Sequence, residues 1–155
     1  MVERSLDVRK VHRFEPCTAH QIKKRGVQFP QRAQFNKKFM WKNLSPTIYR
    51  KRLIIECKLN TKITDKTVDE YLIELSKLLK MTLVAGPLTR NNPRYGISSY
   101  IYWEESGTHF YYWNKPFPFL SIDIYSCKSF SSEEAVEFTH KYFNATELVF
   151  KEIQV

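Results

Sequence analysis

A regular pattern of hydrophobic and polar positions begins near residue 52 and predicts strands and helices to the end of the chain. Residues 52–59 are rich in aliphatic and β-branched side chains and predict a strand. The segment that follows carries apolar residues at helical spacing as far as about Lys80, and Thr64 or Asp65 can cap its first turn. The apolar stripe of this helix comprises Val68, Tyr71, Leu72, Leu75, Leu78 and Leu79.

The next stretch predicts further strands separated by breaks. Residues 81–85 predict a short apolar strand that ends at Gly86-Pro87, and the polar residues 88–95 predict a loop. Runs rich in β-branched and aromatic residues then predict three strands, at 97–103, 109–113 and 119–125. A tight turn is expected between the first two of these strands.

A second helix and a last strand complete the pattern. Ser131 and Glu134 stand at the N-cap and N3 positions of a capping box, which predicts a helix that begins there. Residues 146–153 predict the closing strand. This order indicates an α+β fold, a two-layer sandwich in which a mixed or antiparallel sheet carries two helices on one face.

One face of such a sheet is left uncovered in a single chain. The sequence holds 9 tyrosines and 11 phenylalanines, many of them in the predicted strands. Because a large aromatic surface is costly to leave in water, we expect a partner, most simply a second copy in a homodimer.

The net charge of +9 is concentrated at the N-terminal end of the chain. Residues 1–52 hold 14 lysines and arginines against 3 acidic residues, whereas the remainder holds 11 against 13. We therefore divide the chain into a basic N-terminal extension, residues 1–50, and a domain, residues 51–155. Cations interleaved with aromatics in the extension fit contact with a polyanion such as nucleic acid. No nucleic-acid-binding motif is present, so we favour packing of these aromatics on the domain or on a second subunit.

Composition also bears on membranes, compartment and metals. No run of 18 apolar residues occurs and the first ten residues lack the apolar stretch of a signal peptide, so a cytoplasmic protein without a membrane helix is expected. The cysteines, Cys17, Cys57 and Cys127, are odd in number and too widely spaced for a disulfide framework. Cys17 and His20 have the spacing of metal ligands, but no second pair completes a site, and no metal is expected.

Three motifs at fixed spacing carry a resemblance to a known family. They are Gly96-Ile-Ser98, then Glu105-Ser106 with Trp113 seven residues later, then Asp123-Ile-Tyr-Ser-Cys127. With these motifs the chain resembles the bacterial and archaeal S-adenosylmethionine decarboxylases over about residues 52–155. That family has a two-layer α/β domain, forms dimers and cuts its own chain at a Glu-Ser bond.

The resemblance implies a role for each of these residues. Cleavage between Glu105 and Ser106 would turn Ser106 into a pyruvoyl group, whose carbonyl accepts the electrons released when carbon dioxide leaves. Cys127 would return a proton to the α-carbon, and Ser98 would assist self-processing. Glu105 and Trp113 would bind S-adenosylmethionine, because a sulfonium cation is attracted to carboxylates and to aromatic rings. The decarboxylated product would serve polyamine synthesis.

Two positions differ from the family's pattern. The cleavage serine is followed by histidine in the family and by Gly107 here, and a second family histidine, five residues after the serine, is Tyr111 here. A phenol is a poor base at neutral pH. His109 lies on the same side of the strand as Tyr111, and it is either a substitute for the family histidine or a packed surface histidine.

The departures leave other functions open. An uncleaved relative would bind S-adenosylmethionine, or would break its sulfonium side chain as a lyase with Glu105 or His109 as base. Pyruvoyl chemistry on another amino acid is a related possibility. A different class is a non-catalytic, basic nucleic-acid-binding protein, in which Ser106-Gly107 is an ordinary hairpin turn and Cys127 a small buried hydrophobe.

Overall fold

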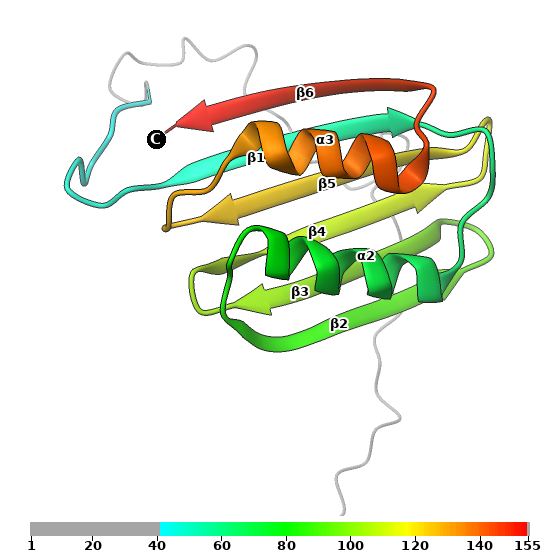
Figure 1. Cartoon of the computed structure of the whole chain (residues 1–155), viewed down its shortest axis with the longest axis horizontal. Helices are drawn as coiled ribbons and strands as arrows, with labels where there is room; N and C mark the ends of the chain where they lie inside the picture. The colour runs from blue at the N-terminus through cyan, green and yellow to red at the C-terminus, as the bar shows by residue number, and fades with distance from the viewer. Residues whose placement is uncertain (1–40, 155) are drawn as a thin grey trace, which may run out of the picture. The chain divides into compact units, whose positions relative to one another are not determined.

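The computed structural model describes residues 41–154, so most of the predicted basic extension, with Cys17 and His20, lies outside the described residues. From residue 43 onward the chain forms one unit with the predicted order of strands and helices (Figure 1). The elements are β1 (Lys51–Lys58), α2 (Asp65–Leu78), β2 (Leu83–Asn92), β3 (Gly96–Trp103), β4 (Ser106–Trp113), β5 (Phe119–Ser126), α3 (Ser132–Phe143) and β6 (Glu147–Gln154).

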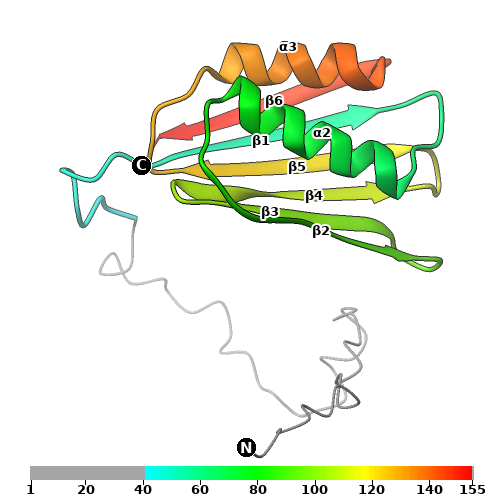
Figure 2. The same ribbon diagram turned by 60° about the horizontal axis from the view of Figure 1, so that its bottom comes forward.

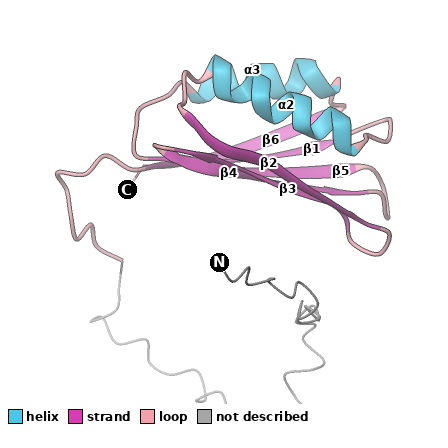
Figure 3. Ribbon diagram, turned by 90° about the horizontal axis from the view of Figure 1, so that it is seen from below, coloured by secondary structure: helices cyan, strands magenta, loops and turns pink. Residues whose placement is uncertain are grey.

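All of these strands join one antiparallel sheet in the order β2-β3-β4-β5-β1-β6. Strands β2 to β5 follow one another through hairpins, whereas β1 is inserted between β5 and β6. Both helices lie on the same face of the sheet, as Figures 2 and 3 show from two further directions. The predicted two-layer α+β sandwich is confirmed, and the sheet is antiparallel throughout.

Side chains at the helix ends fix where each helix begins and stops. The Thr64 side chain accepts a hydrogen bond from the Thr67 N–H at 3.2 Å, and Ser131 accepts one from the Glu134 N–H at 3.1 Å. These bonds satisfy N–H groups that have no partner within the first helical turn. At the other end of α3, Asn144 adopts the left-handed conformation that ends many helices.

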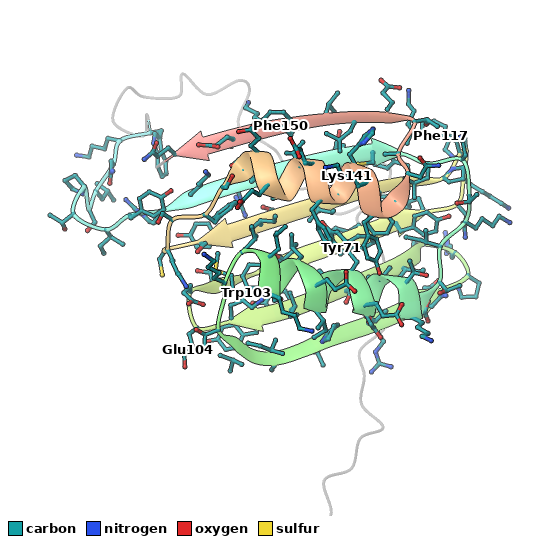
Figure 4. The ribbon with its side chains drawn as sticks, in the orientation of Figure 1. Tyr71, Trp103, Glu104, Phe117, Lys141 and Phe150 are labelled. Atoms are coloured by element: carbon teal, nitrogen blue, oxygen red, sulfur yellow. The ribbon has the colours of Figure 1, made fainter. Side chains whose placement is uncertain are left out.

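The core lies between the helices and the face of the sheet toward them. Tyr71 on α2 and Trp103 on β3, both marked in Figure 4, are fully buried there. The Tyr71 hydroxyl shares a hydrogen bond of 2.8 Å with Thr139, and burial raises the pKa of Tyr71 above its usual range. The Trp103 indole donates to Ser76 at 2.7 Å. Both polar ends are therefore satisfied inside an apolar layer.

One expected loop is a strand. Residues 88–92, predicted as part of a polar loop, continue β2 and pair with β3. The prediction was wrong because β2 is an edge strand whose polar side chains bond to neighbouring elements: Thr89 shares a hydrogen bond with Ser99 on β3 at 2.6 Å, and Asn91 donates to Asp65 on α2 at 2.7 Å. Within residues 41–154, both helices fall short of the length and hydropathy that crossing a bilayer requires.

Candidate functional site

The face of the sheet opposite the helices, which we call the open face, carries a hollow of about 290 Å³. Strands β3 and β4 contribute Tyr100, Tyr102, Ser106, Gly107 and His109 to its walls, and β1 and β5 contribute Arg52, Asp123 and Tyr125. The register explains this gathering, because it places His109 directly between Tyr100 and Asp123 on neighbouring strands.

Arg52 supplies a fixed positive charge to the hollow. Its Nε donates to Asp123 Oδ1 at 2.9 Å, and its guanidinium carbon lies 5.9 Å from the centre of the Tyr125 ring. About half of the Arg52 side chain remains exposed (49%), and no described residue accepts a hydrogen bond from its terminal nitrogens. An anionic group such as a carboxylate can therefore approach the free side of the guanidinium.

Gly107 is required by the close approach of the neighbouring strand β3. A Cβ atom at Gly107 would lie 2.5 Å from the Ile101 carbonyl oxygen and 2.8 Å from the Tyr100 hydroxyl, both far inside van der Waals contact. The Tyr100 ring in turn lies 4.6 Å from the His109 ring, centre to centre. A tyrosine and a histidine, two groups able to carry protons, thus stand beside the backbone that follows Ser106.

The bond between Glu105 and Ser106 lies in a tight bend at one end of the hollow. Ser106 has a φ of 138°, which L-amino acids other than glycine rarely adopt. The Glu105 carbonyl oxygen accepts a hydrogen bond of 2.9 Å from the N–H of Cys127. Ser106 itself pairs with Ser126, the residue before Cys127. The structure therefore brings Glu105, Ser106 and Cys127 together, with the Cys127 side chain exposed.

The Glu105 carboxylate is held in place by its neighbours. It accepts hydrogen bonds from the Thr82 N–H at 2.9 Å and the Thr82 hydroxyl at 3.0 Å, and Lys128 Nζ lies 3.2 Å away. The backbone bond from Thr82 is the main reason that the pKa of Glu105 falls to about 2. The side chain is mostly shielded, at 16% exposure.

The other predicted site residues lie farther along the same face. Ser98 pairs with Tyr111, five positions along β4 from Ser106, which corresponds to roughly 17 Å at the rise of an extended strand. Tyr111 stacks on Trp113, with ring centres 6.0 Å apart, and lies 6.4 Å from His109. One chain therefore contains two groups of candidate residues: a bend group at Ser106, at the end of the hollow, and a distal group at Tyr111 on the open face.

Within residues 41–154 the structure offers few groups for metal binding or thiol chemistry. No cluster of three or more metal-ligating side chains occurs in this part of the chain. Both of its cysteines are free, but they differ in exposure. Burial raises the pKa of Cys57 to about 12, so this thiol stays protonated, whereas Cys127 is exposed beside the bend.

Sequence reasoning missed several residues that shape the site. Arg52 and Tyr125 face each other across β1 and β5, although more than 70 positions separate them in the chain. Thr82 and Lys128, each 23 positions from Glu105 in the chain, likewise bond to its carboxylate. Alternation within each strand indicates which residues share a face, but the pairing of distant strands has no local signal.

Comparison with known proteins finds relatives by sequence family and by structure. A family model described as S-adenosylmethionine decarboxylase matches residues 54–154, more than half of the chain. Among solved structures, an adenosylmethionine decarboxylase from Aquifex aeolicus VF5 matches with a TM-score of 0.56 and 12% identity, over 68% of this chain and 89% of that chain. No curated protein matches the sequence. At 12% identity, the structural likeness shows a shared fold.

Proposed function

Because the chain belongs to the S-adenosylmethionine decarboxylase family, a family of carboxy-lyases, we propose that it decarboxylates S-adenosylmethionine after cutting itself between Glu105 and Ser106. The observation that carries this proposal is the bend itself. A serine in a rarely adopted backbone conformation directly follows a carbonyl that is bonded to the N–H of Cys127. Its role would be to supply decarboxylated S-adenosylmethionine for polyamine synthesis in the cytoplasm.

The bend fits the precursor of a pyruvoyl group. In the first step the Ser106 hydroxyl oxygen attacks the Glu105 carbonyl carbon, the peptide C–N bond breaks, and the hydroxyl proton passes to the released amine. A base then removes the α-proton of Ser106, the bond between Cβ and the ester oxygen breaks, and the chain ending at Glu105 departs as a carboxylate. The dehydroalanine that is left tautomerises to an imine, and water adds to its carbon and releases ammonia, which leaves the pyruvoyl group. The hydrogen bond from Cys127 stabilises the negative charge that develops on the carbonyl oxygen.

The pyruvoyl group supplies an electron-accepting carbonyl for the loss of carbon dioxide. The chain's own residues then have to hold the substrate and move protons. His109 is the base that we assign, since it lines the same hollow as Ser106 and contacts the Tyr100 ring. The exposed thiol of Cys127 is the group that we assign to return a proton to the substrate's α-carbon.

The hollow offers complementary groups to each part of S-adenosylmethionine. Arg52 presents a half-exposed guanidinium to the substrate carboxylate. Tyr102 and Tyr125, at 44% and 38% exposure, present aromatic surface on which an adenine ring or a sulfonium cation can rest. These contacts bind the substrate with its reacting end toward Ser106.

A homodimer packed through the open face completes the site in this proposal. The bend group and the distal group lie roughly 17 Å apart on one chain, too far for Ser98 or Tyr111 to reach Ser106 directly. Two open faces packed about a two-fold axis would set the distal group of one copy against the bend group of the other. Partly exposed rings on this face, at Tyr102, Tyr111 and Tyr125, support such an interface.

Intact mass of the freshly purified chain tests the proposal. Self-cleavage predicts two fragments, of 105 and 50 residues, in place of one chain of 18.5 kDa. Release of carbon dioxide from carboxyl-labelled S-adenosylmethionine, absent from the Ser106→Ala variant, then confirms the reaction. A chain that stays intact and releases no carbon dioxide contradicts it.

One observation favours a second candidate, an uncleaved homologue that binds or breaks down S-adenosylmethionine. A Cβ atom at Gly107 would lie 2.5 Å from the Ile101 backbone carbonyl oxygen, so the side chain that the family carries at this position could not be accommodated unless the backbone shifted. An intact chain that converts S-adenosylmethionine to products retaining the carboxylate would support this lyase.

A further inference from the structure

Hydrogen bonds and an ion pair with Thr82, Cys127 and Lys128 connect the bend before Ser106 to the rest of the fold. The Glu104 N–H donates to the Thr82 carbonyl oxygen at 3.0 Å, and the Glu105 carbonyl oxygen accepts from Cys127 at 2.9 Å. The Glu105 carboxylate adds the two bonds from Thr82 and the pair with Lys128. Lys128 Nζ is itself fixed by a second bond, to the Lys80 carbonyl oxygen.

The backbone at Ser106 needs such support. A φ of 138° brings the Cβ of an L-residue into steric conflict with its own backbone, and such conformations persist only where surrounding structure enforces them. Within the bend, the side chain that makes the most contacts with other elements is that of Glu105, the residue directly before the strained position.

We call the contacts of the Glu105 carboxylate with Thr82 and Lys128 the clamp, and they depend on the charge of that carboxylate. The carboxylate is ionised across the neutral range, since the hydrogen bonds that it accepts favour its charged form. Lys128 is partly exposed, at 43%, so it contributes chiefly as a second anchor for a carboxylate already bound by Thr82.

We propose that Glu105 acts as a positioning residue through this clamp, which forces Ser106 into its strained conformation and so holds the hydroxyl against the Glu105 carbonyl. The inference rests on the proposed self-cleavage. In the step that it serves, the Ser106 oxygen bonds to the carbonyl carbon, the peptide C–N bond breaks, and the hydroxyl proton moves to the freed nitrogen. Breaking that bond releases Ser106 from the enforced φ, so the strain favours cleavage.

The link between clamp and strain can be tested in chains that cannot cleave. Ser106→Gly and Ser106→Ala both remove the hydroxyl, but only glycine adopts a positive φ without strain. With the clamp intact, we expect the glycine variant to melt about 4–8 °C above the alanine variant. In the Glu105→Ala background the bend can relax, and we expect less than half of that difference.

Glu104→Ala is the matched control for this cycle. Glu104 precedes Glu105 in the same turn and carries the same charge, but its exposed side chain points away from the sheet (Figure 4) and accepts no hydrogen bond from a described residue. The glycine advantage should survive in this background. Equal glycine–alanine differences in the Glu105→Ala and Glu104→Ala backgrounds overturn the clamp.

The kinetic part is tested on chains that retain Ser106. We expect Thr82→Val and Lys128→Met to slow the appearance of the 50-residue fragment about 10–100-fold, as loss of alignment does. Thr82→Ser and Lys128→Arg should restore most of the rate, which a general loss of stability would not predict. An intact wild-type chain overturns the proposed function and this kinetic part together, while the melting cycle decides the clamp separately.

Discussion

The two faces of the sheet are built from the same strands but by different rules. On the face toward the helices, most buried side chains are apolar, and two large ones pair their polar ends: Tyr71 with Thr139 and Trp103 with Ser76. On the open face, charges and partly exposed tyrosines surround a hollow, and a serine lies in a strained conformation. Stability is therefore concentrated on one face and reactivity on the other, and substitutions should separate the two.

Ser106→Ala should have the largest effect on function and little effect on folding. Without the hydroxyl no acyl shift can begin, so we expect complete loss of self-cleavage and of carbon dioxide release. Intact mass checks the first and labelled substrate the second. Ser129→Ala, at an exposed serine outside the open face, is the control and should cleave normally. A Ser106→Ala chain that still splits after Glu105 would contradict the assignment.

The neighbours Trp103 and Tyr102 provide the sharpest contrast between the faces. Trp103→Ala removes a fully buried indole, and we expect the free energy of unfolding to fall by about 3–5 kcal/mol. Tyr102→Ala removes a ring that is 44% exposed in a single chain, and the expected cost to the unfolding of the monomer is below about 1 kcal/mol. Urea unfolding measures both. Equal losses would show that the open face is also a buried core, as in a tight dimer.

Arg52→Met should weaken substrate binding without unfolding the protein. A hydrogen bond to a charged group contributes about 1.5–3 kcal/mol, so we expect S-adenosylmethionine to bind about 10–100-fold more weakly. Calorimetry on the uncleavable Ser106→Ala chain measures this apart from catalysis. Lys58→Met is the control, since Lys58 is a cation on the same strand that pairs with Glu147 outside the hollow. Equal weakening in both variants would indicate a general charge effect.

The fold could be read from the sequence to the extent that it depends on local patterns. Helical spacing and the caps at Thr64 and Ser131 placed both helices, because capping groups act within three residues. The strand over residues 88–92 was missed, since an edge strand can be polar on both faces. The candidate site was predicted where motifs are contiguous, as at Glu105-Ser106.

The surroundings of the bend could not be predicted in this way. Thr82 and Lys128 are ordinary residues in the sequence, and their role arises only when a chain reversal and a strand end bring them to Glu105. Gly107 has a more local explanation: a side chain there would collide with the Ile101 carbonyl oxygen across the β3–β4 hairpin. The contacts of Glu105, in contrast, depend on the packing of the whole sheet rather than on any one segment.

The smallest expected effect is a pH dependence of stability that comes from Glu105. Its pKa is lowered from 4.5 to about 2 in the folded chain, so it adds stability above the unfolded pKa and loses it as pH falls through the folded one. Since the carboxylate is partly hydrated, its contribution is small. In the uncleavable chain at pH 6, we expect the free energy of unfolding with Glu105 to exceed that of the Glu105→Gln variant by about 1 kcal/mol. That difference should decline between pH 4.5 and 2. Glu104→Gln, at a carboxylate that accepts no hydrogen bond from a described residue, is the control. If the difference between the Glu105 and Glu105→Gln chains stayed constant with pH, the clamp would depend on the shape of the side chain rather than on its charge. The two faces of the sheet would then differ in packing alone.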